Sequence, residues 1–353
     1  MSLRDQLIAR ITSQGPITIA DFMAEALLHP EYGYYATRDP LGEDGDFTTS
    51  PEISQMFGEL VGLSLAQSWL DQGAPTPFTL AELGPGRGTL MADILRATAR
   101  VPGFHAAAQI TLVEASPTLR AAQRATLSAH DIAHVDGADA LPDAPLWLVA
   151  NEFFDALPIR QFQRDGAGWR ERSVGVRDGA LSFGLSPAAP QALLDHRLDD
   201  TSDEQVVELC PTAAPILSAI AARIQTRGGA ALIIDYGDWR SLGDTFQALQ
   251  NHQPVNPLAD PGNADLTAHV DFEALCAAAG PIAHSRVTPQ GIFLERLGIT
   301  ARAQALAKKL DGPALEAHIA AHRRLTHPEE MGNLFKVLGL FPDHAAPPPG
   351  LEQ

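Results

Sequence analysis

The segment FTLAELGPGRGTL (78–90) decides the fold that we expect for this chain. A short apolar strand over 78–83 leads into a glycine-rich turn at 84–88, and a helix is expected over 89–100. The glycines permit a tight turn and the close approach of a ligand to the backbone. The amino end of the helix that follows is a site for a negative group. A strand, a glycine turn and a helix in this order are typical of proteins that bind nucleotide-like cofactors.

Strands and helices alternate along the residues that follow. This alternation predicts an α/β fold, a doubly wound parallel sheet with helices on both faces. Further strands are expected at 110–114, 132–135, 146–150 and 230–236, and further helices at 116–130 and 213–225.

Additional segments surround this expected core. Helices are predicted within 2–29, where Thr18 and Asp21 suit the start of the second one, and again at 55–69. Residues 159–185 alternate apolar and polar side chains around two Asp-Gly turns, which predicts a β-meander. We expect an N-terminal helical and lid segment over 1–75 and a core in two parts, 76–158 and 206–300. The β-meander and its loop are inserted between these parts, over 159–205. C-terminal helices are expected over 301–353, ending in a frayed tail, AAPPPGLEQ.

The composition excludes several classes of function. The 353 residues include 25 Lys and Arg against 43 Asp and Glu, a formal charge of −18, whereas nucleic-acid-binding surfaces are basic. Cys210 and Cys276 lie far apart, so we expect no disulfide framework, no metal site and a reducing compartment. No apolar run approaches the roughly 18 residues that span a bilayer, and no leader segment is visible. We therefore expect a protein of a reducing compartment without membrane insertion.

The acids beside the glycine turn favour one cofactor. Glu82 ends the first strand just ahead of the glycines, where its carboxylate would repel a pyrophosphate but could pair with the ammonium of a methionine moiety. The turn also reads G-x-G-x-G rather than the dinucleotide pattern G-x-G-x-x-G. Glu114 ends the second strand, where it could accept both hydroxyls of a ribose. These features favour S-adenosylmethionine (SAM), with a dinucleotide or a turn without ligand as alternatives.

Two further clusters carry candidate site residues. Asn151, Glu152 and Asp155 follow the strand at 146–150, and ligands of doubly wound sheets bind at the carboxyl ends of strands. The segment GDFTTSPE (45–52) contains Asp46 and Ser50. Ser50 suits the cap of the helix that follows, and we expect the segment to form a lid over the cofactor. His269-Val270-Asp271 is the nearest pattern to a metal-ligand pair, but a helix-capping role for Asp271 is favoured.

Seven motifs lie in order along nearly the whole chain: HPEYGYY (29–35), GDFTTSPEISQMFGE (45–59), ELGPGRGTL (82–90), ANEFFDALP (150–158), IDYG (234–237), DLTAHVDF (265–272) and NLFKVLGL (333–340). Together they resemble the MidA-like family of SAM-dependent methyltransferases, which includes the mitochondrial assembly factor for respiratory complex I. The resemblance implies a class I methyltransferase core with helical and β additions. It also implies a bacterial cytoplasmic location for this chain and an organellar matrix for the mitochondrial relatives. The residues expected to bind SAM are Glu82, Gly84, Gly86, Gly88, Thr89, Glu114, Ser50 and Asn151.

The resemblance also implies a protein substrate, an arginine of a complex I subunit methylated as an assembly step. Because a guanidinium arrives protonated, carboxylates would bind its N–H groups in fork geometry. The residues expected to do this are Glu152 and Asp155, with Asn151 as an orienting group and Asp46 as a further candidate. One departure is that Gln247 and Gln250 stand where the family has a basic stretch.

Three other readings stay open: a methyltransferase for small amines, a SAM-binding assembly factor without catalysis, and a nicotinamide-dependent oxidoreductase. The last would need a pyrophosphate beside Glu82. The sequence also leaves open whether the chain forms an oligomer.

Overall fold

A computed structural model describes residues 1–37 and 49–353 of the chain. The candidate Asp46 lies outside the described residues. Contacts divide the chain into two compact units, each of which is assembled from three stretches of sequence. Unit 1 comprises residues 1–47, 155–213 and 238–274, and unit 2 comprises residues 48–154, 214–237 and 275–353.

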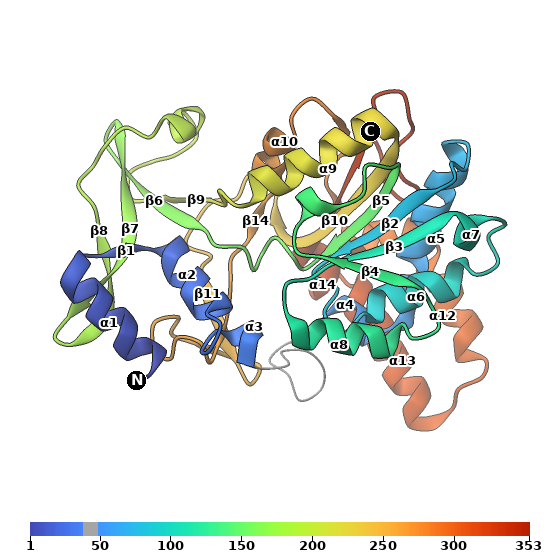
Figure 1. The fold of residues 1–353 in the computed structure, drawn as a ribbon, viewed down its shortest axis with the longest axis horizontal. Helices are drawn as coiled ribbons and strands as arrows, with labels where there is room; N and C mark the ends of the chain where they lie inside the picture. The colour runs from blue at the N-terminus through green and yellow to red at the C-terminus, as the bar shows by residue number, and fades with distance from the viewer. Residues whose placement is uncertain (38–48) are drawn as a thin grey trace. The chain divides into compact units, whose positions relative to one another are not determined.

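Unit 2 is built on a mostly parallel sheet, and the expected α/β core is confirmed (Figure 1). Five parallel strands lie in the order β10, β5, β2, β3, β4, and β17 joins β10 as an antiparallel neighbour. The chain runs outward from β2 in one direction and from β5 in the other, so the switch point lies between them. The strands are β2 Phe78–Leu83, β3 Ala108–Val113, β4 Ile132–Val135, β5 Leu146–Asn151, β10 Gly229–Asp238 and β17 Phe335–Phe341.

The central strands are apolar along their whole length because both of their faces are covered. Every residue of β2 and of β5 is buried, which is the pattern of strands inside a parallel sheet. Pairing of Leu83 with both Val113 and Ala150 aligns the carboxyl ends of β3, β2 and β5. The residues that follow these three strands are therefore brought to one edge of the sheet.

Helices surround this sheet (Figure 1), and α8 begins where the sequence predicts. Ser116 caps α8 (Pro117–Thr126) by accepting from the Leu119 N–H, and Pro117 takes its first position. The other helices within unit 2 are α4 Ser50–Ile53, α5 Gln55–Asp71, α6 Thr89–Thr98, α7 Phe104–Ala107, α11 Gln290–Arg296, α12 Ile299–Ala307, α13 Gly312–Thr326 and α14 Met331–Leu334, while α9 Ala213–Arg227 and α10 Phe272–Ala279 begin at the end of unit 1 stretches.

The C-terminal tail is ordered, so the expectation of a frayed end is wrong. Leu351 is 8% exposed and belongs to the apolar core of unit 2. The Arg286 N–H donates to the Glu352 carbonyl at 2.8 Å, and the Ser64 hydroxyl donates to the Pro349 carbonyl at 2.7 Å. Apolar burial and backbone hydrogen bonds keep the C-terminal tail in place, although its composition is typical of a disordered terminus.

Unit 1 combines the N-terminal helices with two small antiparallel sheets. The helices α1 (Leu3–Gln14) and α2 (Ile19–Leu28) each start with a capping box, and the expected Thr18–Asp21 pair forms the second one. The predicted β-meander is also confirmed as β6, β7 and β8, paired in register across both Asp-Gly turns. One sheet has the order β1-β7-β6-β9 with β8 beside β7, and the other has the order β12-β11-β13. The bounds are β1 Ile17–Thr18, α3 Tyr34–Thr37, β6 Arg160–Asp165, β7 Gly168–Arg177, β8 Ala180–Leu185, β9 Val206–Leu209, β11 Gln247–Gln250, β12 Gln253–Val255 and β13 Asp265–Thr267.

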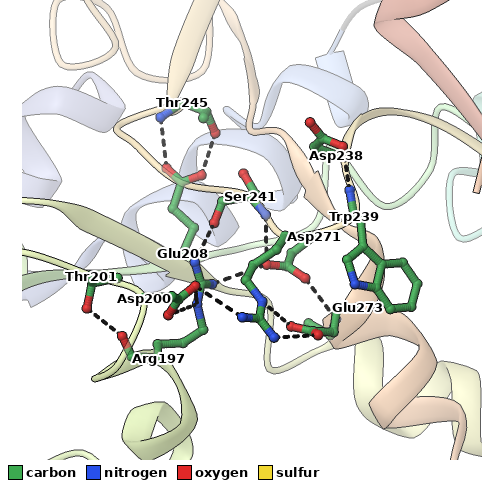
Figure 2. Close-up of polar contacts among 12 residues, drawn as sticks. Arg197, Asp200, Thr201, Glu208, Asp238, Trp239, Ser241, Thr245, Asp271 and Glu273 are labelled. Carbon is green, nitrogen blue, oxygen red and sulfur yellow. Dashed lines mark hydrogen bonds and ion pairs between the residues drawn. The ribbon is translucent and has the colours of Figure 1, made fainter.

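A network of paired charges joins separate segments of unit 1 (Figure 2). Arg197, only 3% exposed as a side chain, contacts the carboxylates of Asp200 at 3.1 Å and Asp271 at 3.5 Å. It also donates to the Ser241 carbonyl at 3.1 Å. Asp271 in turn accepts from the Ala274 N–H at 2.8 Å, which confirms its predicted capping role. Each of these charges has a partner, so removal of one partner would leave a charge without compensation.

None of the helices in residues 1–37 and 49–353 is long and apolar enough to cross a membrane.

Candidate active site

The glycine turn between β2 and α6 adopts a conformation that suits glycine. Gly84, Gly86 and Gly88 have φ values of 58°, 52° and 84°, in the left-handed region that other residues rarely adopt. The Gly88 N–H closes the turn by donating to the Pro85 carbonyl at 2.7 Å. A Cβ atom on Gly84 would lie 2.9 Å from the ring of Phe153. Close packing and backbone geometry therefore both require glycine at this position.

Glu82 is a buried carboxylate with incomplete hydrogen bonding. Its residue is 3% exposed, and it accepts a backbone hydrogen bond from Met91 in the first turn of α6. Its Oε2 atom has no hydrogen-bond partner among the described residues. Burial raises the pKa of Glu82 to about 8. A buried acceptor of this kind is costly unless a ligand supplies the missing donor.

Glu114 is held at the end of β3 by neighbouring donors. Its Oε1 accepts from the Ser116 N–H at 2.8 Å, and its Oε2 accepts from the amide of Gln123 at 3.3 Å. The same Gln123 amide donates to the Gly86 carbonyl at 2.7 Å. Burial raises the pKa of Glu114, while these hydrogen bonds oppose the rise. Gln123 thus links the predicted ribose-binding acid to the glycine turn.

Asn151 and Glu152 lie together at the end of β5. The Asn151 amide donates to Glu152 Oε1 at 2.9 Å, and the Ser50 N–H donates to the same oxygen at 3.1 Å. Glu152 has a φ of 52°, an uncommon conformation for a residue with a side chain and one that clusters at functional sites. The Oδ1 atom of Asn151 is buried and has no hydrogen-bond partner in the described part of the chain.

The predicted cap at Ser50 is wrong in its detail. Thr49 takes the cap position and Ser50 begins α4, with its hydroxyl directed to Gln290 at 3.3 Å. The carboxylate of Glu52 accepts from the Thr89 hydroxyl at 2.7 Å, so α4 is tied to the first residue of α6. The sequence signal was misleading because two adjacent residues, Thr49 and Ser50, both suit a cap.

The predicted site residues fall into two groups. Unit 2 brings together the glycine turn with Glu82, Glu114, Asn151 and Glu152, and it also contains Ser50 and Thr89. Asp155, in contrast, belongs to unit 1, where its carbonyl accepts from the Ala268 N–H at 3.0 Å.

Sequence reasoning missed three fully buried polar residues in unit 2. Gln123 links Glu114 to the turn, Gln290 accepts from Ser50, and Asp235 accepts from the Phe154 N–H at 3.0 Å and thereby holds the end of the Asn151–Phe154 segment. Asp235 belongs to the IDYG motif, which was the available signal. The two glutamines lie on helices and have no sequence pattern that separates them from surface glutamines.

The donor and acceptor set fits SAM. The unsatisfied Glu82 oxygen suits an ammonium group, and the glycine turn lets the backbone approach a ligand. Glu114, oriented by Ser116 and Gln123, suits two ribose hydroxyls. A pyrophosphate would instead meet the buried acid of Glu82. The residues at the carboxyl ends of β2, β3 and β5 therefore suit a cationic amino-acid moiety joined to a nucleoside.

Comparison with known proteins agrees with this geometry. Residues 60–289 match the profile of a family described as S-adenosyl-L-methionine-dependent methyltransferases. The chain is 39% identical over 365 residues to "Protein arginine methyltransferase NDUFAF7, mitochondrial" of Bos taurus, covering 95% of this chain and 82% of the relative. The Homo sapiens protein of the same name is 38% identical with the same coverage.

A solved structure is similar over nearly the whole chain. It is a COG1565 superfamily member from Burkholderia thailandensis bound to S-adenosyl-homocysteine, with a TM-score of 0.82 and 30% identity, and the match covers 96% of this chain and 91% of that one. These matches confirm the resemblance, the class I methyltransferase fold and the SAM cofactor that the sequence predicted. The chain belongs to this family of SAM-dependent methyltransferases.

Proposed function

We propose that this methyltransferase modifies an arginine side chain of a protein. The observation that carries the proposal is the 39% identity, over 95% of the chain, to relatives named protein arginine methyltransferases. The acidic residues beside the strand ends support it, because they suit a cationic acceptor. The acceptor that the family resemblance implies is a subunit of respiratory complex I.

Methyl transfer requires the protein mainly to position the two reactants and to control the charge of the guanidinium. SAM supplies an electrophilic methyl group on sulfur. The acceptor nitrogen forms the new bond as the bond from sulfur to the methyl carbon breaks, and the guanidinium loses one proton. Correct placement of the two reactants accounts for much of such a rate enhancement. The guanidinium is protonated at neutral pH, so carboxylates must bind its other N–H groups and favour loss of the proton.

Glu152 and Asp155 stay our candidates for these carboxylates. The contact from the Asn151 amide to Glu152 supports an orienting role for Asn151. We expect Glu152→Gln to abolish methyl transfer while SAM affinity stays nearly unchanged. Measuring both quantities on one preparation tests this assignment, since an equal loss of SAM binding would place Glu152 in the cofactor site instead.

Methyl transfer to purified complex I tests the proposed acceptor. The protein is incubated with SAM labelled in its methyl group, and peptides are mapped by mass spectrometry, with Gly86→Val as the inactive control. A labelled arginine in one subunit supports the proposal. Labelling confined to added small amines would favour the small-molecule reading, and SAM binding without any transfer would favour the assembly factor without catalysis. The cytoplasmic location stays a prediction.

A further inference from the structure

The side chain of Gln123 contacts both strand β4 and the glycine turn. It comes from α8, and the residue is fully buried. Its Nε2 atom donates to the Gly86 carbonyl at 2.7 Å and to Glu114 Oε2 at 3.3 Å. Its Oε1 atom lies 2.8 Å from Nε2 of His134, a residue of β4. Both ends of the Gln123 amide therefore contact polar partners.

The Gly86 carbonyl fixes the direction of these hydrogen bonds. A carbonyl oxygen can only accept, so the nitrogen end of the Gln123 amide must face Gly86. The oxygen end then faces His134, and an amide oxygen can also only accept. Nε2 of His134 must therefore carry a proton and act as the donor. The hydrogen bonds run from His134 through Gln123 to Glu114.

The surroundings of His134 favour a neutral imidazole with its proton on Nε2. Burial lowers the pKa of His134, and the positive charges of Arg124 and Arg120 lower it further. A neutral imidazole carries a proton on only one of its two nitrogens. Nδ1 is buried and has no hydrogen-bond partner in residues 1–37 and 49–353, whereas Nε2 has Gln123 as an acceptor. The tautomer that donates to Gln123 is therefore the stable one.

We propose that His134 is a positioning residue of the cofactor site. Its Nε2–H fixes the Gln123 amide, and this amide orients the Glu114 carboxylate to bind the ribose hydroxyls of SAM. The inference is independent of the methyl acceptor and rests on the ribose-binding role of Glu114. All three residues belong to unit 2. Loss of the donor would leave the buried oxygen of Gln123 without its partner, a cost that is relieved when the amide turns away from Glu114.

Calorimetric titration with two ligands separates this role from a structural one. The ligands are S-adenosyl-homocysteine and its dideoxy analogue, which lacks both ribose hydroxyls. His134→Phe keeps an aromatic ring and removes the donor. We expect it to weaken binding of S-adenosyl-homocysteine by about three- to tenfold, the size expected for one lost hydrogen bond, and to leave binding of the dideoxy analogue unchanged. An equal loss for both ligands would indicate a general disturbance and would overturn the proposal.

Two further substitutions serve as matched controls. His134→Gln places an amide N–H near the position of the imidazole Nε2–H, and it should keep most of the wild-type affinity for S-adenosyl-homocysteine. A loss as large as that in His134→Phe would overturn the donor role. His105→Phe changes another histidine of unit 2, whose Nε2 lies 3.0 Å from the Thr98 hydroxyl. It should leave the affinities for both ligands unchanged.

Glu114→Ala distinguishes a failure of the His134 assignment from a failure of the ribose assignment. It should remove the preference for S-adenosyl-homocysteine over the dideoxy analogue. If it does so while folded His134→Phe binds both ligands like the wild type, the positioning role of His134 is wrong and Glu114 keeps its role. If the wild type binds both ligands equally, the ribose assignment fails and the proposal fails with it.

The tautomer of His134 tests the proposal without any substitution. Nitrogen NMR of the imidazole in the full wild-type chain distinguishes a protonated ring nitrogen from one with a lone pair. We expect a proton on Nε2 and a lone pair on Nδ1 at neutral pH, with and without S-adenosyl-homocysteine. A lone pair on Nε2 would overturn the donor role, and this measurement decides the matter even if His134→Phe does not fold.

Discussion

Two buried glutamates, one in each unit, show opposite uses of a buried acid. Glu82 and Glu208 are 3% and 6% exposed, and burial raises the pKa of both. Glu208 accepts from the Gln161 amide at 2.6 Å, from the Thr245 N–H at 3.0 Å and from the Thr245 hydroxyl. Glu82 has one backbone donor, and its Oε2 has no partner among the described residues.

We infer that completeness of hydrogen bonding, rather than burial or a raised pKa, distinguishes structural acids from ligand-binding acids in this protein. A carboxylate whose acceptor sites are filled joins segments of chain. A buried carboxylate oxygen without a hydrogen-bond donor costs free energy, and a ligand that supplies the donor removes this cost. Arg197 and its partners in Figure 2 belong with Glu208, since their charges are paired within unit 1.

The largest expected effect comes from breaking the paired network. Arg197→Ala leaves the carboxylates of Asp200 and Asp271 without their buried cation. We expect a loss of about 3–5 kcal/mol in the free energy of unfolding, as for other broken buried ion pairs. Chemical denaturation measures this loss. A change below about 1 kcal/mol would show that the network does not hold unit 1 together.

Glu208→Gln gives a smaller effect and sharpens the comparison. The substitution removes one acceptor from three donated hydrogen bonds, and we expect a loss of about 1–3 kcal/mol in the free energy of unfolding. SAM affinity should not change, because Glu208 lies in unit 1 and outside the cofactor residues. Denaturation and calorimetry on the same preparation check both statements, and weakened SAM binding would contradict the second one.

The raised pKa of Glu82 predicts release of a proton on SAM binding. With a pKa of about 8, the acid is mostly protonated at pH 7 in the free protein. Pairing with an ammonium requires the ionised form, so binding should release close to one proton per site and tighten as the pH rises from 6 to 7. Calorimetry in two buffers of different ionisation enthalpy counts the protons. Equal heats in both buffers would show that Glu82 is already ionised.

The raised pKa of Glu82 also makes the stability of the free protein depend on pH. The folded-state pKa lies above the ordinary value of 4.5, so the folded form binds more protons than the unfolded form between these two values. Glu82 therefore destabilises the free protein progressively as the pH rises from about 4.5 to about 8. The difference in unfolding free energy between Glu82→Gln and the wild type should grow over this interval.

The smallest effect is expected at the exposed edge of the charge network. Arg240 is paired with Glu273 at 2.6 Å, but its side chain is 38% exposed. We expect Arg240→Ala to lower the unfolding free energy far less than Arg197→Ala does, because water and salt screen an exposed ion pair. It serves as the matched control for Arg197→Ala, and equal losses in the two variants would remove burial as the reason for the larger effect.

Much of the fold could be predicted because local signals and the tertiary structure agree. Apolar runs predicted β2 and β5, and Thr18 with Asp21 predicted the start of α2. Two Asp-Gly turns predicted the β-meander. The frayed tail was wrong because Leu351 is held by a core that the local composition does not reveal. Pairing between strands that are distant in sequence is decided by burial and not by propensity.

The candidate site could be predicted where side-chain type and backbone position coincide. Glu82 and Glu114 were singled out because acids at strand ends next to a glycine turn have a recognisable chemistry, and their roles stay predictions. Gln123 could not be found, since its role depends on reaching from α8 to Gly86 and Glu114 at once.

Calorimetric titration of SAM into the wild type and Glu82→Gln tests whether the buried acid of Glu82 binds the ammonium group of the cofactor. We expect micromolar binding to the wild type and a loss of affinity of roughly a hundredfold in Glu82→Gln, the size expected for a buried charge-assisted hydrogen bond. NADH should not bind either protein. Equal SAM affinity in the two proteins, with both folded, would contradict the claim that the unfilled acid of Glu82 is the site of the cofactor's ammonium.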